Sequence, residues 1–180
     1  MKTNPYLRGG IALGLILTLL FSCAAADTAF SFRNGVTWAS TVADMMAAEG
    51  LRDGGGNYNR HTQNGYTFFY LWNRGGKTED VYYVFRGDQP VTAYFLLSGG
   101  SDAYAAERER QTALYGSPAD VSADTVAALL NAANPGSVRP DDFSRLTAWR
   151  LADGTVAALF TIGGDSYMAY FHEQRILNGA

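Results

Sequence analysis

The sequence is poor in the residues that carry most metal and redox chemistry. Its 180 residues include one cysteine and two histidines, which excludes a disulfide framework and a cysteine-based zinc site. The balance of 14 Lys+Arg against 17 Asp+Glu, a net charge of −3, lacks the basic excess of nucleic-acid-binding proteins. What remains is a globular composition, 47% hydrophobic and 17% charged, whose length fits one domain or two small repeats.

The N-terminus has the pattern of a secretory signal peptide. Lys2 and Arg8 form a short basic head before the apolar run Ile11–Phe21. This run is shorter than the roughly 20 residues that cross a bilayer. Small residues follow it in Ser22–Ala26. We therefore predict that residues 1–22 are a signal peptide.

Cys23 is the predicted site of lipidation. The segment Leu20–Cys23 resembles a bacterial lipobox, with a leucine three residues before the cysteine and a small residue directly before it. Acyl chains on Cys23 would attach the protein to a membrane on the extracytoplasmic side. The alternative is cleavage before Asp27, which would release a soluble protein. In the first case residues 23–30 are a tether and residues 31–178 form the folded domain.

Capping residues, periodicity and turn signals predict the elements of that domain. A helix begins after Ser40 or Thr41 and ends at Gly50, and Asp53–Gly65 is predicted to be a loop. Aromatic and β-branched runs predict strands, and helical periodicity bounded by glycine and proline predicts two more helices. The predicted strands are 66–72, 81–85, 91–97, 143–151, 155–162 and 166–172, and the later helices are 102–115 and 122–133.

The dipeptide Asp153-Gly154 predicts a two-residue hairpin turn. If Ala152 pairs with Thr155, Trp149 lies opposite Ala158. One face of this hairpin is then apolar and the other mixed, which is typical of an antiparallel sheet covered by helices on one side.

The two halves of the domain share one order of elements. Residues 31–100 and residues 101–178 each begin with helix and end in an antiparallel meander. The predicted fold class is therefore α+β, with tandem helix-plus-meander units, about six strands joined edge to edge, and helices packed on one face.

Short motifs support a resemblance to a known family. They are the lipobox at Cys23, Asn34–Trp38 before a helix that ends at Gly50, and Leu114–Pro118. The chain thereby resembles small bacterial lipoproteins of the BamE/SmpA kind and the related β-lactamase-inhibitor-protein fold. The resemblance implies tandem helix-plus-sheet units. It also implies either a role in assembling outer-membrane proteins or the binding of an enzyme across a concave aromatic sheet.

The sequence contains no catalytic or cofactor motif. His61 and His172 lack partners at metal-ligand spacing. Gly54–Gly56 is not followed by the lysine and hydroxyl residue of a phosphate-binding loop. Asn64 stands where a calcium loop would need glutamate. We therefore expect no cofactor, no metal and no catalytic residues.

Aromatic residues are the most prominent feature, at 13% of the chain. They lie in near-continuous runs on the predicted strands, so alternation sends half of each run to either face. One half belongs to the core, and the other half is either covered by another element or available for binding. The residues predicted to contact a partner are Tyr66, Phe68, Tyr70, Trp72, Tyr82 and Tyr94.

These observations predict an exported, lipid-anchored binding or assembly module of the bacterial cell envelope. It would act without catalysis and recognise another envelope protein through an aromatic sheet face. Two alternatives stay open at this point. One is an extracytoplasmic, hydrolase-like enzyme that uses acids of the Asp53–Gly65 loop or His61. The other is a structural envelope protein without a discrete ligand.

Overall fold

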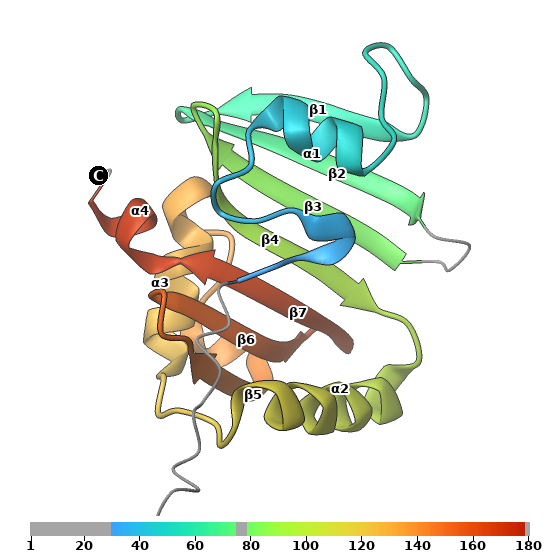
Figure 1. Cartoon of the computed structure of the whole chain (residues 1–180). Coiled ribbons are helices and arrows are strands. Elements are labelled where there is room, and N and C mark those ends of the chain that lie inside the picture. Colours follow the sequence, from blue (N-terminus) through green and yellow to red (C-terminus); the bar gives the residue numbers. More distant parts are fainter. Residues whose placement is uncertain (1–29, 75–78, 179–180) are drawn as a thin grey trace, which may run out of the picture.

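A computed structural model describes residues 30–74 and 79–178, so Cys23 and the predicted signal peptide lie outside the described residues. The fold is a seven-stranded antiparallel sheet in the order β1-β2-β3-β4-β7-β6-β5 (Figure 1). The strands are β1 Tyr58–Gln63, β2 Tyr66–Arg74, β3 Glu79–Arg86, β4 Gln89–Leu97, β5 Phe143–Arg150, β6 Thr155–Ile162 and β7 Asp165–His172. The helices are α1 Val42–Ala48, α2 Gly100–Tyr115, α3 Ala123–Ala133 and α4 Glu173–Leu177, with short 3-10 turns η1 Arg33–Gly35 and η2 Pro140–Asp142.

The predicted α+β class is confirmed, with one strand more than expected. The prediction of a loop over Asp53–Gly65 is wrong for Tyr58–Gln63, which forms the edge strand β1 and pairs with β2. Asn64 and Gly65 connect the two strands with positive φ values of 51° and 78°, as a tight hairpin turn requires. The strand escapes pattern-based prediction because it is polar and almost entirely exposed.

The two meanders join through the antiparallel pairing of β4 with β7, from Thr92 opposite Phe171 to Leu97 opposite Ser166. This is the predicted edge-to-edge join. It gives one continuous sheet in which strands from both halves of the chain are central neighbours. A site on this sheet can therefore draw side chains from both halves.

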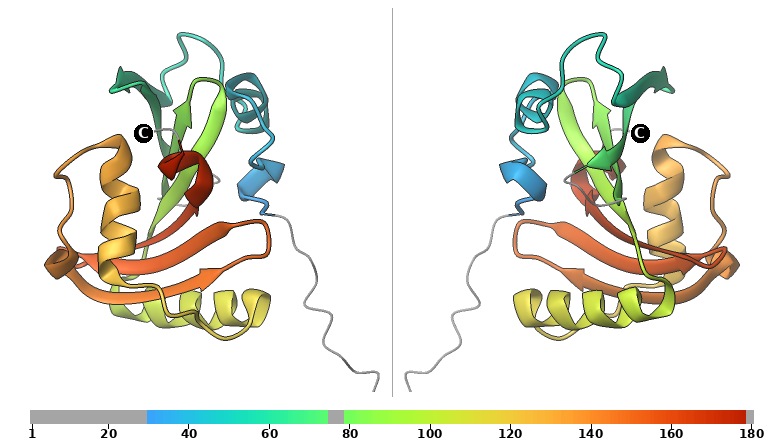
Figure 2. Two further views of the ribbon diagram at one scale, coloured as in Figure 1. Left: turned by 90° about the vertical axis from the view of Figure 1, so that its left-hand side faces the viewer. Right: turned by 90° about the vertical axis from the view of Figure 1, so that its right-hand side faces the viewer.

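Helices cover both faces of the sheet, whereas the sequence predicted cover on one face. Figure 2 shows α1 on one side of the sheet and α3 on the other. The front face, toward the viewer in Figure 1, packs against α1, α2 and the N-terminal segment, and the back face packs against α3 and α4. Strand β6 needs cover on both faces, because its residues Thr155–Thr161 are all buried whichever way their side chains point. Strands that lie between two helical layers have this pattern.

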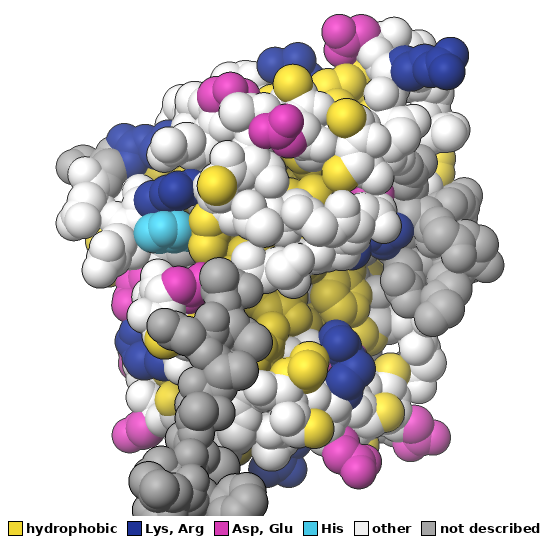
Figure 3. Space-filling model, in the orientation of Figure 1, with side chains coloured by type: hydrophobic (Ala, Val, Ile, Leu, Met, Phe, Trp, Pro, Cys, Tyr) yellow, Lys and Arg dark blue, Asp and Glu magenta, His cyan; other side chains and the backbone are white. Residues whose placement is uncertain are grey.

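Two clusters fill the layers on either side of the sheet. The front cluster includes Phe69, Leu71, Tyr83, Phe85, Leu159, Met168 and Tyr170. The back cluster includes Val84, Val91, Ala158, Phe160, Phe171, and Val126 and Leu129 of α3. On the front face, apolar side chains remain visible at the surface between the N-terminal segment and α2 (Figure 3).

The predicted register of the β5–β6 hairpin is wrong by one residue. Trp149 pairs with Ala157, not with Ala158. The turn has three residues, because the Leu151 N–H donates to the Thr155 carbonyl at 2.9 Å and Gly154 adopts φ 81°, a common hairpin form. A shift of one residue exchanges the faces, so Trp149 enters the front cluster.

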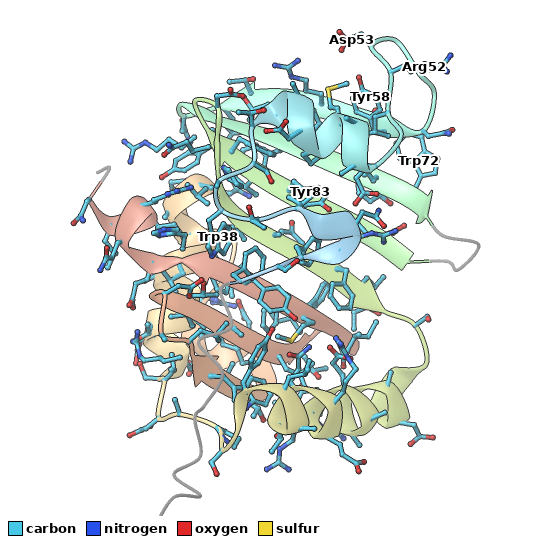
Figure 4. The ribbon with its side chains drawn as sticks, in the orientation of Figure 1. Trp38, Arg52, Asp53, Tyr58, Trp72 and Tyr83 are labelled. Carbon is cyan, nitrogen blue, oxygen red and sulfur yellow. The ribbon has the colours of Figure 1, made fainter. Side chains whose placement is uncertain are left out.

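An N-terminal strap, residues 30–41, fastens the front of the sheet. Phe30 stacks on Trp38 with ring centroids 4.1 Å apart. The indole N–H of Trp38 donates to the Thr155 hydroxyl at 2.7 Å, and the backbone N–H of Phe30 donates to an Asp153 carboxylate oxygen at 2.9 Å. In Figure 4 Trp38 lies on the left, near the end of β7 where the chain enters α4. The strap thus fixes the point at which the chain enters the described fold.

A buried carboxylate links the strap, α1 and β3. Glu49, the residue that ends α1, is 3% exposed. It accepts a 2.6 Å hydrogen bond from the Tyr83 hydroxyl and pairs with the Arg33 guanidinium at 3.2 Å. At the other end of the helix, Thr41 and Asp44 form a capping box, and Thr41 is one of the two cap residues that the sequence predicted.

Candidate binding groove

The back face carries a groove of about 430 Å³ between the sheet and the end of α3. We call it the aromatic groove. Its floor is formed by β2, β3, β4 and β7 through Phe68, Tyr70, Tyr82, Tyr94 and Tyr167. Its wall is formed by α3 and the segment after it through Leu129, Leu130, Ala133, Asn134, Ser137 and Val138. His61 and Gln63 of β1 complete one side, and Phe160 and Ile162 of β6 the other.

A ladder of stacked tyrosines forms the centre of the floor. Tyr70 pairs with Tyr82 and Tyr82 with Tyr94 across neighbouring strands. Their ring centroids are 4.7 Å and 4.4 Å apart, with interplanar angles of 21° and 7°. Aromatic pairs of this geometry contribute about 0.5–1.5 kcal/mol each beyond the area they bury. Cross-strand pairing therefore holds the three rings in a fixed stack.

The tyrosine hydroxyls of the floor are held in their neutral form. Burial, together with the negative charges that Tyr70 and Asp80 can carry, raises the pKa of Tyr82 to about 12. Burial also raises the pKa of Tyr94. The hydrogen bond from the Tyr70 hydroxyl to Asp80, 2.9 Å long, raises the pKa of Tyr70. These groups offer hydrogen bonds without charge at any physiological pH.

The wall of the groove is fixed by one asparagine. Asn131 donates from its side-chain amide to the Val138 carbonyl at 2.7 Å and accepts from the Val138 N–H at 3.0 Å. The Ser137 hydroxyl donates to the same amide oxygen at 3.0 Å. The segment that follows α3 is thereby fastened to the helix, which gives the groove a preformed wall.

Most of the predicted partner-contact residues lie at this groove. Phe68, Tyr70, Tyr82 and Tyr94 line it. Trp72 lies beside it, with its ring 5.6 Å from that of Tyr70 at 44°. Tyr66 shares the back face but is 7% exposed, and the Arg86 guanidinium lies 5.7 Å from its ring centroid.

Sequence reasoning missed the half of the groove that comes from the second meander and α3. Tyr167, Phe160, Leu130 and Val138 all line it. Their local patterns are those of ordinary core residues of a strand or a helix. Only the pairing of β4 with β7 and the docking of α3 on the back face bring them to the tyrosine ladder.

The residues proposed for the enzyme alternative lie apart from one another. Asp53 belongs to the loop between α1 and β1, at the outer end of the molecule in Figure 4. His61 lines the groove and stacks on Phe68, with centroids 4.6 Å apart and planes 2° apart. Within residues 30–74 and 79–178, no three His, Cys, Asp or Glu side chains gather as a metal site would require.

Two further observations concern the chain as a whole. Among the described residues, no helix is both long and apolar enough to cross a membrane. Comparison with models of protein families, with curated proteins and with solved structures finds no match for this chain.

Proposed function

We propose that this protein is a binding module that holds an uncharged, apolar segment of a partner protein in the aromatic groove. The observation that carries the proposal is the lining itself. Among the described residues that line the groove there is no Asp, Glu, Lys or Arg, and Tyr70, Tyr82, Tyr94 and Tyr167 all have a raised pKa and stay neutral. A charged segment would lose its hydration there without gaining a partner, whereas removing an apolar segment from water is favourable.

The volume and the preformed lining of the groove support the binding of a partner side chain in it. Its volume of about 430 Å³ falls in the range of sites that bury a ligand of a few rings. Aromatic residues in pockets supply most of the binding energy in many protein interfaces. The tyrosine ladder and the hydrogen bond from Asn131 to Val138 are already formed. Binding therefore loses little conformational entropy in the groove.

The expected location follows from Cys23. We propose that this residue is acylated and attaches the module to a membrane of the bacterial envelope. The tether from Cys23 to Phe30 spans at most about 25 Å when fully extended. The strap would then hold the domain close to the membrane, in reach of other envelope proteins. Mass spectrometry of the mature N-terminus tests this part, since an N-terminus at Asp27 would contradict it.

The groove is tested by photo-crosslinking in the cells that make the protein. Ser137 is exposed and lines the groove, so a photoreactive residue placed there reaches its occupant. Ser117 is also exposed but lies outside the groove, so it serves as the matched control position. We expect a discrete crosslinked protein from position 137 and none from position 117.

A second variant ties the crosslink to the groove. Leu130→Trp adds a large ring to the wall and fills the space, while Leu114→Trp adds the same ring at an exposed position of α2. The crosslink from position 137 is expected to disappear in the first variant and to persist in the second. A crosslink that survives Leu130→Trp contradicts the proposal.

A further inference from the structure

A second hollow, of about 310 Å³, lies where the β3–β4 turn meets α4. It has the opposite chemistry to the aromatic groove. It is lined by Val91 and by six polar or charged residues, Arg86, Gln89, His172, Gln174, Arg175 and Asn178. The described lining contains two arginines and no Asp or Glu, so two positive charges face one small space. We call it the arginine pocket.

Arg86 is held in place without neutralisation of its charge. Its guanidinium carbon lies 5.7 Å from the centroid of the Tyr66 ring. Its Nη1 atom is buried, and it has no hydrogen-bond partner in the part of the chain that the structure describes. A buried donor without a partner is costly, more so when it carries charge. Arg86 also forms no ion pair within residues 30–74 and 79–178.

Arg175 is anchored through neutral groups alone. One of its Nη atoms donates to the carbonyls of Trp38 and Pro90, at 2.6 Å and 3.1 Å. Burial lowers its pKa, and it forms no ion pair within residues 30–74 and 79–178. The two carbonyls fix the position of the guanidinium and leave its charge without a counterion.

His172 adds a neutral donor. Its Nδ1 atom accepts a 3.4 Å hydrogen bond from the Arg175 backbone N–H, so the proton of the neutral ring is on Nε2. Burial and the neighbouring Arg175 charge lower its pKa, which keeps this form at neutral pH. The side-chain amides of Gln89, Gln174 and Asn178 provide further N–H donors around the same space.

We propose that the arginine pocket is a binding site for an oxyanion, a phosphate or carboxylate group held between Arg86 and Arg175. Guanidinium groups bind such oxygens through pairs of parallel hydrogen bonds. A dianionic phosphate group matches the two uncompensated charges, and a carboxylate matches the forked geometry of either arginine. This site is separate from the aromatic groove and does not depend on the function proposed for it.

The test is a titration of the protein with inorganic phosphate at constant ionic strength, followed by backbone amide NMR. We expect saturable shifts confined to residues 86–91 and 172–178. Arg86→Gln is expected to weaken binding at least about tenfold, because it removes one charged fork. Arg86→Lys keeps the charge but loses the fork, so its affinity is expected to lie in between. Arg52→Gln, at an exposed loop position, is the matched control and should bind like the unmodified protein.

A parallel titration with acetate distinguishes the two sources of the oxygen ligand. Saturation by phosphate alone assigns a phosphate group, and saturation by acetate alone assigns a carboxylate. The Leu130→Trp variant should bind the same anion unchanged, which separates this site from the groove. Unsaturable shifts with both anions, or equal affinity in a folded Arg86→Gln variant, would overturn the proposal.

Discussion

Tyr82 and Tyr94, neighbours across β3 and β4, stack with ring centroids 4.4 Å apart and planes 7° apart. Because Tyr70 covers the other side of Tyr82, both faces of the Tyr82 ring are occupied within the protein. At Tyr82 an occupant of the groove therefore meets the ring edge and a neutral hydroxyl rather than a free aromatic face. This arrangement favours aliphatic or aromatic side chains over a ligand that needs to stack on an exposed ring.

The ladder also stabilises the fold. Replacing Tyr82 with Ala removes two stacked pairs and the buried area of the ring, so we expect a loss of about 2 kcal/mol in the free energy of unfolding. Urea denaturation measures this change. Leu114→Ala, at an exposed helix position, is the control and should change stability little. A Tyr82→Ala protein as stable as the control would show that the stack contributes nothing.

Stability should fall at alkaline pH because of the ladder. The pKa of Tyr82 is raised to about 12 in the folded protein, above the value of about 10 in an unfolded chain. Between these values the unfolded state binds fewer protons, so stability is complete below about pH 10 and is lost as pH rises toward 12. Denaturation series on both sides of pH 10 measure the slope. Tyr82→Phe should reduce it, and an unchanged slope would argue against this origin.

The wall of the groove depends on Asn131. Asn131→Ala removes three hydrogen bonds to Ser137 and Val138, and we expect it to cost about 1–2 kcal/mol of stability. Hydrogen exchange of the Val138 amide should become faster, and the crosslink from position 137 should weaken. Asn57→Ala, in the exposed loop before β1, is the control. Slow exchange at Val138 in the Asn131→Ala variant would contradict the assigned role.

Asp153 fastens the strap to the β5–β6 turn. Its carboxylate accepts the N–H groups of Thr155 and Phe30, both at 2.9 Å. Burial alone would raise its pKa, but the hydrogen bond of the Thr155 side chain and these two backbone hydrogen bonds outweigh burial and lower it. The stability that Asp153 contributes is therefore present above the unfolded pKa of about 3.9 and is lost as pH falls through the lower folded value.

The corresponding variant is Asp153→Asn. Its side-chain amide is uncharged and has one acceptor oxygen, so it cannot replace both carboxylate oxygens that accept these hydrogen bonds. We expect a loss of about 1–2 kcal/mol at neutral pH and a flatter acid limb in the plot of stability against pH. Asp141→Asn, at an exposed position, is the matched control. Identical acid limbs in the two variants would show that Asp153 does not hold the strap.

Local signals predicted most of the fold. The strand and helix positions follow from capping residues such as Thr41 and Ser122 and from β-branched and aromatic runs. Alternation also placed Phe68, Tyr70, Tyr82 and Tyr94 on a common face, where the structure has them. The polar strand β1 and the helix α4 were missed, since neither has the periodicity that marks a buried element.

Tertiary relationships lay beyond local pattern. The position of α3 on the back face depends on the burial of Val126 and Leu129 against both meanders. These contacts join residues far apart in the chain, so no local stretch of sequence predicts them. The register of β5 against β6 differs from the predicted one by one residue, because the turn before Thr155 has three residues instead of two. The dipeptide Asp-Gly is compatible with both hairpin forms. The arginine pocket is likewise assembled from residues that lie far apart in sequence, at 86–91 and 172–178.

We propose that the aromatic groove is the surface that binds the partner. Its most direct test is the affinity of the protein crosslinked from position 137 for three forms of this chain, measured by calorimetry. We expect Leu130→Trp to bind at least about a hundredfold more weakly than the unmodified protein, because the filled groove excludes the anchor side chain. Leu114→Trp should bind equally well. Equal affinity of all three forms would contradict the account.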